Sequence, residues 1–153
     1  MKIGILGGSF DPAHKGHLAI SKEARKRFKL EKIIWAITKK NPLKAESKTP
    51  ISKKIKDCKK IIGLNSFIKV KFYENIIKSN KTIDLINYLK KNKNIEIFFL
   101  MGADNLISFH KWHKSKLISQ KCNIIVFDRH GYKKNSLKSK TFKRLNNKTL
   151  TFV

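Results

Sequence analysis

The chain has 153 residues, of which 41% are hydrophobic and 30% are charged, and its formal net charge is +26 at pH 7. The length suits one domain with a proper core, and ten phenylalanines argue against a disordered chain. No apolar stretch approaches the roughly 20 residues that cross a bilayer. The sequence runs directly into the first predicted strand, so we expect no signal peptide. We therefore expect a cytoplasmic protein with no membrane partner.

Apolar runs alternate with amphipathic stretches along the whole chain. Buried strands are expected over residues 3–6, 32–37, 95–101 and 122–127, an edge-like strand over 67–72, and the start of another at 149–153. Helical spacing of apolar residues is found over 14–28, 51–62, 79–89 and 106–117. This alternation predicts an α/β fold, a Rossmann-like doubly wound parallel sheet, in a single domain over residues 1–153.

The positive charge is carried mainly by lysines spread along the chain. Such a charge permits nucleic-acid binding and also attracts phosphorylated substrates. Lysine-rich helix faces are usually solvated, however, and abundant Lys, Asn and Ile together are typical of coding bias. We therefore do not expect specific nucleic-acid binding.

Two cysteines, Cys58 and Cys122, lie in different segments without the spacing of metal ligands. Such residues are usually reduced and buried. Neither a disulfide nor a protein-bound metal site is expected.

Residues 7–17, between the first strand and the first helix, read Gly-Gly-Ser-Phe-Asp-Pro-Ala-His-Lys-Gly-His. In an open parallel sheet this turn lies at the carboxyl ends of the strands, where ligands bind. The adjacent Gly7 and Gly8 let the backbone turn sharply and let a bulky anion approach. His14 and His17 can project from one side of the helix's first turn, whose unpaired N–H groups would add a phosphate site. The plain alternative is a turn whose histidines are solvated or satisfied locally.

This segment closely resembles the signature of the HxGH nucleotidyltransferase superfamily. The resemblance covers eleven residues in order, and it implies catalytic roles for His14 and His17. It also implies that ATP is bound by this turn and by the end of a later strand. The implied ATP-binding residues are Gly7, Gly8, Ser9, Phe10, His14, Gly16, His17, Gly102 and Asp104.

Later segments narrow the resemblance to bacterial nicotinate-nucleotide adenylyltransferases. Residues 41–44 resemble that family's loop after the second strand, and residues 99–112 resemble its Gly-x-Asp…Trp segment. The resemblance assigns Asp104 to the adenosine ribose, and Lys44, Thr82 and Trp112 to the mononucleotide. Each residue also has a plain explanation, because a lysine can simply be exposed, Thr and Asp cap helices, and Trp packs in cores. Because the motif at residues 7–17 is present in the same chain, we favour the functional interpretation of these residues.

The family resemblance implies adenylyl transfer from ATP to nicotinate mononucleotide, which gives nicotinate adenine dinucleotide and pyrophosphate in NAD biosynthesis. A phosphate monoester has its second pKa near ~6, so the attacking group is already anionic and needs no general base. The reaction needs alignment of two anions and neutralisation of charge on oxygen. His14, His17 and the glycine-lined turn would supply part of this, and Mg²⁺ held mainly by the ATP phosphates would supply the rest.

The family also carries a second phosphate-binding signature, Ile-Ser-Ser-Thr-x-x-Arg, at the start of a helix after the last strand. The 153 residues contain no such segment. We therefore expect either a C-terminally truncated fragment or a naturally short form with impaired catalysis, and the sequence leaves this choice open.

Other functions also stay open. Phosphopantetheine adenylyltransferases have a similar first motif, although the pattern of Thr82, Gly102 and Trp112 fits the nicotinate enzymes better. Nicotinamide mononucleotide is an alternative acceptor. A truncated nucleotide-binding form with little activity, or a basic nucleic-acid-binding module, would belong to a different class. The sequence predicts no oligomeric state.

Overall fold

The computed structural model describes residues 1–39, 49–102, 105, 109, 111–127 and 150–152. Within these residues, six parallel strands form one sheet in the order β3-β2-β1-β4-β5-β6. The elements are β1 (Lys2–Gly8), α1 (Lys15–Phe28), β2 (Lys32–Ile37), α2 (Ile51–Ile62), β3 (Ile68–Lys71), α3 (Glu74–Ile77), α4 (Thr82–Leu89), β4 (Glu96–Gly102), α6 (Ser115–Lys121), β5 (Asn123–Phe127) and β6 (Leu150–Phe152). This strand order is that of the doubly wound fold and confirms the predicted class.

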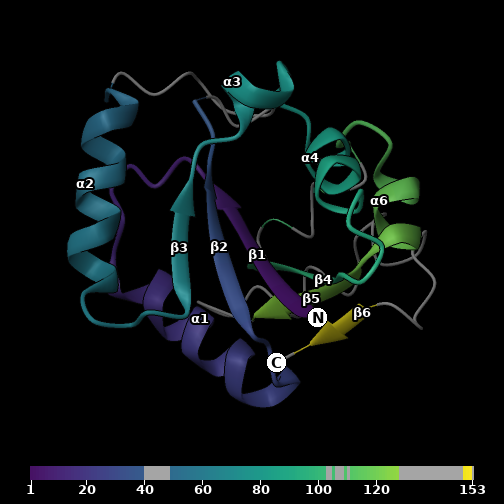
Figure 1. The fold of residues 1–153 in the computed structure, drawn as a ribbon, viewed down its shortest axis with the longest axis horizontal. Coiled ribbons are helices and arrows are strands. Elements are labelled where there is room, and N and C mark those ends of the chain that lie inside the picture. The colour runs from purple at the N-terminus through teal and green to yellow at the C-terminus, as the bar shows by residue number, and fades with distance from the viewer. Residues whose placement is uncertain (40–48, 103–104, 106–108, 110, 128–149, 153) are drawn as a thin grey trace.

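Apolar residues alternate between the two faces of the sheet because successive side chains of a strand point in opposite directions. Ile3 and Ile5 of β1 lie in the cluster that α4 and α6 cover. Leu6 lies in the cluster on the other face, which α1 and α2 cover. Figure 1 shows β1 between β2 and β4, with α1 and α2 on one side and α4 and α6 on the other.

Close packing fixes one glycine of β1. A Cβ on Gly4 would come within 2.9 Å of Leu30 Cδ1 and 3.2 Å of Ile33 Cγ1. Because the first distance is shorter than real Cβ contacts, a side chain at residue 4 would force the buried Leu30 side chain to shift.

The elements follow the sequence prediction with shifts of up to three residues at other ends, such as α4 beginning at Thr82 and not at 79, and with three larger differences. β1 continues through Gly8, so its two final glycines lie in the strand and not in the turn. The short helix α3, Glu74–Ile77, was not predicted. Of the helix predicted over 106–117, residues 111–114 form turns and bends, Lys114 has a left-handed φ of 54°, and α6 begins only at Ser115.

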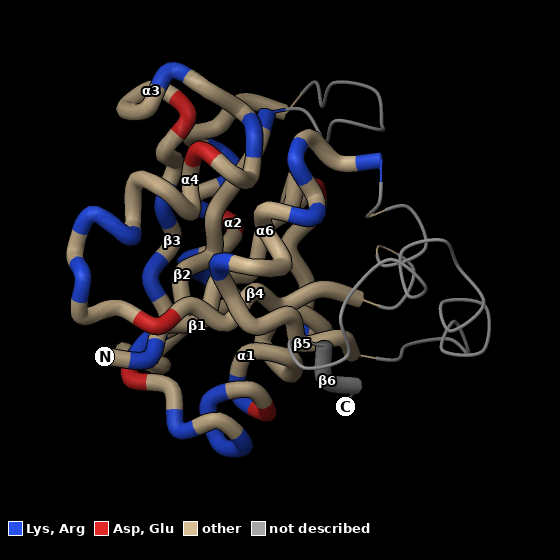
Figure 2. Tube along the Cα trace, turned by 90° about the vertical axis from the view of Figure 1, so that its right-hand side faces the viewer, with Lys and Arg blue, Asp and Glu red and all other residues tan. Residues whose placement is uncertain are grey.

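The burial of both cysteines agrees with the sequence interpretation. Cys58 and Cys122 are both buried and free. Lys and Arg occur on outer helices and connecting segments around the chain (Figure 2). Lys54 is an exception, because its side chain is 1% exposed and its Nζ donates to the carbonyl of Thr38 at 3.4 Å. Among the described residues, no helix is both long enough and apolar enough to span a membrane.

Candidate functional site

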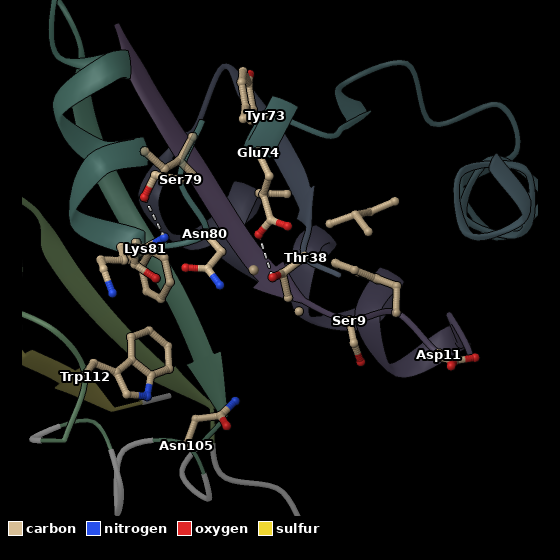
Figure 3. Close-up of a pocket in the computed structure, with 18 of the residues that line it drawn as sticks. Ser9, Asp11, Thr38, Tyr73, Glu74, Ser79, Asn80, Lys81, Asn105 and Trp112 are labelled. Carbon is tan, nitrogen blue, oxygen red and sulfur yellow. Dashed lines mark hydrogen bonds between the residues drawn. The ribbon is translucent and has the colours of Figure 1, made fainter. Parts of the chain in front are cut away.

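A cavity of about 330 Å³ opens at the carboxyl ends of β1 and β2. This volume lies within the range of small-molecule sites, which is roughly 300–1,000 Å³. The cavity is next to β1, where the strand order reverses between β2 and β4, and doubly wound folds bind ligands at this crevice. Its lining includes Gly7, Gly8, Ser9, Phe10, Asp11, His14, His17, Thr38, Tyr73, Glu74, Ser79, Asn80, Lys81, Thr82, Asn105 and Trp112. Figure 3 shows part of this lining.

The two histidines form a reciprocal cap on α1. Nδ1 of His14, the N-cap residue, accepts from the backbone N–H of Gly16 at 3.1 Å. Nδ1 of His17 accepts from the backbone N–H of His14, also at 3.1 Å. An accepting Nδ1 carries no proton, so in each neutral ring the proton is on Nε2. The two rings are stacked with centroids 3.9 Å apart.

This cap limits one expectation. The sequence suggested that unpaired N–H groups at the start of α1 would bind phosphate, but the imidazoles already accept from those of His14 and Gly16. The imidazole Nε2–H groups are further hydrogen-bond donors at this helix end. The local bonds use only Nδ1 of each ring, so they leave Nε2 for a chemical role.

The imidazole ring of His17 packs against the aromatic rings of Phe10 and Trp35. Phe10 is 3% exposed, and its ring centroid lies 4.6 Å from that of His17 and 5.2 Å from that of Trp35. Phe10 has a φ of 49°, so the sharp turn expected at the glycines is made by a non-glycine residue further along. Its ring is part of the core, so a contact between Phe10 and ATP would come from the main chain.

Gly7 and Gly8 leave room in the cavity, and they do not form the sharp turn. A Cβ on Gly7 would lie 3.7 Å from Phe99, and one on Gly8 would lie 3.6 Å from Phe10. Both are ordinary contact distances. Packing within the protein therefore does not demand glycine at either position, whereas a Cβ at Gly4 would require the Leu30 side chain to move.

A second polar pair, which sequence reasoning missed, closes the side of the cavity next to β2. The Glu74 carboxylate accepts from Thr38 Oγ1 at 2.7 Å and from the backbone N–H of Lys39 at 3.1 Å. The dashed line between Thr38 and Glu74 in Figure 3 marks the first bond. It ties the end of β2 to the segment after β3. The available signal was that Thr38 directly follows β2 and Glu74 comes three residues after β3, both at the ligand-binding edge.

The opposite wall comes from α4 and the segment before α6. Thr82 is the first residue of α4, and no side chain caps this helix, so Thr82 is not the cap that the plain explanation offered. Trp112 is half-buried, and its ring lies edge-on to Phe99 and Phe109, with centroids 5.9 and 5.0 Å away. It therefore both packs on the core and lines the cavity. Burial raises the pKa of Tyr73, which also lines this space, and Tyr88 adds to the effect.

The structure thus brings together most of the expected residues. Eight of them line the cavity: Gly7, Gly8, Ser9, Phe10, His14, His17, Thr82 and Trp112. Gly16 and Gly102 do not line it, since Gly16 lies in the helix cap and Gly102 is buried at the end of β4. Lys44 and Asp104 lie outside the described residues.

Groups of side chains that could bind a metal ion were sought in the part of the chain that the structure describes. No group of three or more His, Cys, Asp or Glu side chains there is placed to hold an ion. These residues therefore do not fit a resident metal held by a protein cage.

Comparison with known proteins shows which family the chain belongs to. The model of the family described as cytidylyltransferase-like matches residues 5–149. A probable nicotinate-nucleotide adenylyltransferase of Pelagibacter ubique is 65% identical over 152 residues, which are 99% of this chain and 84% of that protein. One from Rhizobium johnstonii is 33% identical over 142 residues, 92% of this chain and 71% of that protein.

Solved structures agree on the fold. The Plasmodium falciparum nicotinic acid mononucleotide adenylyltransferase complexed with NaAD matches with a TM-score of 0.76 and 21% identity, over 99% of this chain and 75% of that one. The same enzyme complexed with APC gives a TM-score of 0.77 and 22% identity, over 99% and 74%. The sequence relatives, which are more similar, decide the family. The chain belongs to the nicotinate-nucleotide adenylyltransferase family of cytidylyltransferase-like proteins.

Proposed function

We propose that this protein transfers the adenylyl group of ATP to nicotinate mononucleotide. The observation that carries the proposal is the imidazole cap at the cavity, where both Nδ1 atoms accept backbone N–H groups and both rings therefore present Nε2–H. Two fixed, neutral donors beside glycine-lined space suit a polyphosphate. The family membership selects the substrates, because the relatives carry this activity in their names.

The reaction is an in-line displacement at the α-phosphorus of ATP. A phosphate oxygen of the mononucleotide attacks, a new P–O bond forms, and the bond from the α-phosphorus to the bridging oxygen breaks. Pyrophosphate leaves with that oxygen and its electron pair. Since the attacking phosphate is already anionic, the protein's task is alignment and neutralisation of charge.

We assign the residues as follows. Nε2–H of His14 and Nε2–H of His17 donate to oxygens of the ATP phosphates, which gain charge as the bond breaks. Gly7 and Gly8 leave room for the phosphates beside β1. Thr82 and Trp112 hold the nicotinate end of the acceptor, with Trp112 offering an aromatic face. Lys44 and Asp104 keep the roles that the family resemblance implies.

Mg²⁺ enters this proposal as part of the substrate. Because the described residues offer no cage for the ion, it would be held chiefly by ATP phosphate oxygens and water.

A pyrophosphate-release assay tests the proposal. The purified chain is incubated with ATP and, in separate reactions, with nicotinate mononucleotide, nicotinamide mononucleotide or phosphopantetheine. We expect release with nicotinate mononucleotide and formation of the dinucleotide. Release that depends only on phosphopantetheine, or no release with any acceptor, would overturn the assignment.

A further inference from the structure

Two buried polar side chains outside the cavity lining tie His17 to the centre of the sheet. Ser21 and Trp35 are both 0% exposed, one on α1 and the other on β2. The indole Nε1–H of Trp35 donates to Ser21 Oγ at 2.8 Å. Ser21 Oγ donates in turn to the backbone carbonyl of His17, also at 2.8 Å. A chain of two hydrogen bonds thus joins the first turn of α1 to β2.

The same tryptophan touches the ring of His17. Their ring centroids lie 5.7 Å apart, and Phe10, which stacks on Trp35 with an interplanar angle of 18°, lies against His17 as well. Trp35 therefore reaches His17 by two routes. Through Ser21 it holds the main chain, and directly and through Phe10 it supports the imidazole.

This arrangement leaves little freedom to His17. Its ring is fixed at Nδ1 by the backbone N–H of His14, its carbonyl by Ser21, and its ring face by aromatic neighbours. A buried indole N–H needs a partner, and a serine within a helix could have satisfied itself with a local carbonyl alone. Here one hydroxyl serves both requirements. The helix turn that carries the imidazole therefore cannot shift along β2 unless one of these bonds breaks.

We propose that Ser21 and Trp35 are positioning residues, which hold His17 Nε2 at the depth and angle needed to meet the ATP phosphates. The inference rests on the proposed function. Neither residue touches substrate in this assignment. Their role is to prevent small displacements, and a misplacement of about 1 Å at a reacting group can lower the rate roughly a hundredfold.

The first test compares two serine-to-alanine variants. Ser21→Ala removes the link, whereas Ser119→Ala, the matched control, removes another buried hydroxyl that donates to a carbonyl of its own helix, Lys116 in α6. At a temperature where both variants are fully folded, we expect Ser21→Ala to lower kcat by about tenfold or more, with KM for both substrates within about twofold of wild type. Ser119→Ala should keep wild-type kcat. Equal kcat values in the two variants would overturn the proposal.

The second test needs no substrate, so it separates this inference from the proposed reaction. Long-range ¹H–¹⁵N spectra report the environment of each imidazole nitrogen. We expect wild type and Ser119→Ala to give one sharp set of His17 ring signals, because the helix turn is held against β2. Ser21→Ala and Trp35→Phe each remove the hydrogen bond that links this turn to β2, so both should broaden or split the His17 signals. If the wild type releases no pyrophosphate, the proposed function fails and these spectra still test the positioning. A sharp, single set of His17 signals in both Ser21→Ala and Trp35→Phe would refute it.

Discussion

His14 and His17 cap the helix that they begin, since the backbone N–H of His14 donates to Nδ1 of His17 at 3.1 Å while Nδ1 of His14 accepts from Gly16. A helix cap of this reciprocal kind is usually built from Ser or Thr and, three residues later, Glu or Gln. Here imidazoles take both positions. A chemically useful donor, Nε2–H, is thereby fixed by the same bonds that begin the helix.

The cap and the chemistry can be separated by mutation. His14→Ser combined with His17→Gln restores the usual capping pair, so we expect a melting temperature at or near that of wild type. Turnover should fall by at least about a hundredfold, because the fixed Nε2–H donors are gone. Thermal unfolding and the pyrophosphate assay measure the two effects. Turnover close to wild type would contradict the roles given to both histidines.

His17→Ala is the matching single variant. It removes the donor and also the acceptor for the backbone N–H of His14. We therefore expect the same loss of turnover together with a loss of about 1 kcal/mol in the free energy of unfolding, the usual effect of deleting a cap. Denaturant titration checks the second number. A stability equal to that of the double variant would mean that the cap contributes nothing.

Trp112 should affect one substrate and not the other. Its ring packs edge-on to Phe99 and Phe109 and lines the cavity, and Trp112→Ala removes an aromatic face on the side given to the mononucleotide. We expect a raised KM for nicotinate mononucleotide and an unchanged KM for ATP. Initial rates with each substrate varied in turn measure this. Equal changes in both values would indicate that Trp112 serves only the core.

Thr38 and Glu74 form a measurable clamp between distant segments. Thr38→Val and Glu74→Ala each remove one partner of the bond from Oγ1 to the carboxylate, and a double-mutant cycle isolates the pair. Because the acceptor is a carboxylate in a half-buried position, we expect a coupling energy of about 1–2 kcal/mol. Glu74→Gln, which keeps an acceptor oxygen, should retain part of it. A coupling near zero would mean that the two segments are held by other contacts.

The two thiols should be inert in the folded protein. Burial raises the pKa of Cys58 to about 11, with Asp57 adding to the effect, and burial raises that of Cys122 to about 12. In the unfolded chain a thiol has a pKa near ~8.5. At pH 8.5 iodoacetamide should therefore label both residues slowly in the native protein and rapidly in guanidinium, as followed by mass spectrometry. Fast native labelling at either residue would contradict its burial.

The raised pKa values of the two thiols also predict how the free energy of unfolding changes with pH. Both folded-state pKa values lie above the unfolded one, so the thiols' contribution to the unfolding free energy is complete below about pH 8.5 and is lost as the pH rises toward 11 and 12. A Cys58→Ala variant should lose less of its stability over that window than wild type does.

The alternation of strand and helix was readable from the sequence because it depends on local periodicity. The limits of β2, Lys32–Ile37, and of α2, Ile51–Ile62, agree with the prediction to the residue. The four-residue helix α3 was missed because it is too short for a period to show. The bond between Thr38 and Glu74 joins residues 36 apart in sequence, and no local pattern reveals such a pair.

The site, too, was predictable in part: its location could be read from the sequence, but its geometry could not. The motif of residues 7–17 located the cavity, because family resemblance and the edge of a parallel sheet point to one place. It did not reveal how the residues act within that place. The turn is made by Phe10 and not by a glycine, and the helix N–H groups of His14 and Gly16 are already used. The first fact depends on the main-chain conformation at Phe10 and the second on side-chain geometry, and the sequence pattern encodes neither.

The glycines of β1 have a consequence for how this protein would respond to random mutation. A methyl group at residue 4 would displace the buried Leu30 side chain, whereas one at residue 7 or 8 would meet only ordinary contacts. A selection for folded, abundant protein should therefore act more strongly against Gly4→Ala than against Gly7→Ala or Gly8→Ala. Yet only the changes at residues 7 and 8 fill space that we assign to ATP. Variants of this kind would accumulate in cells as stable, well-expressed and inactive protein, and a survey of expression levels would overlook the site.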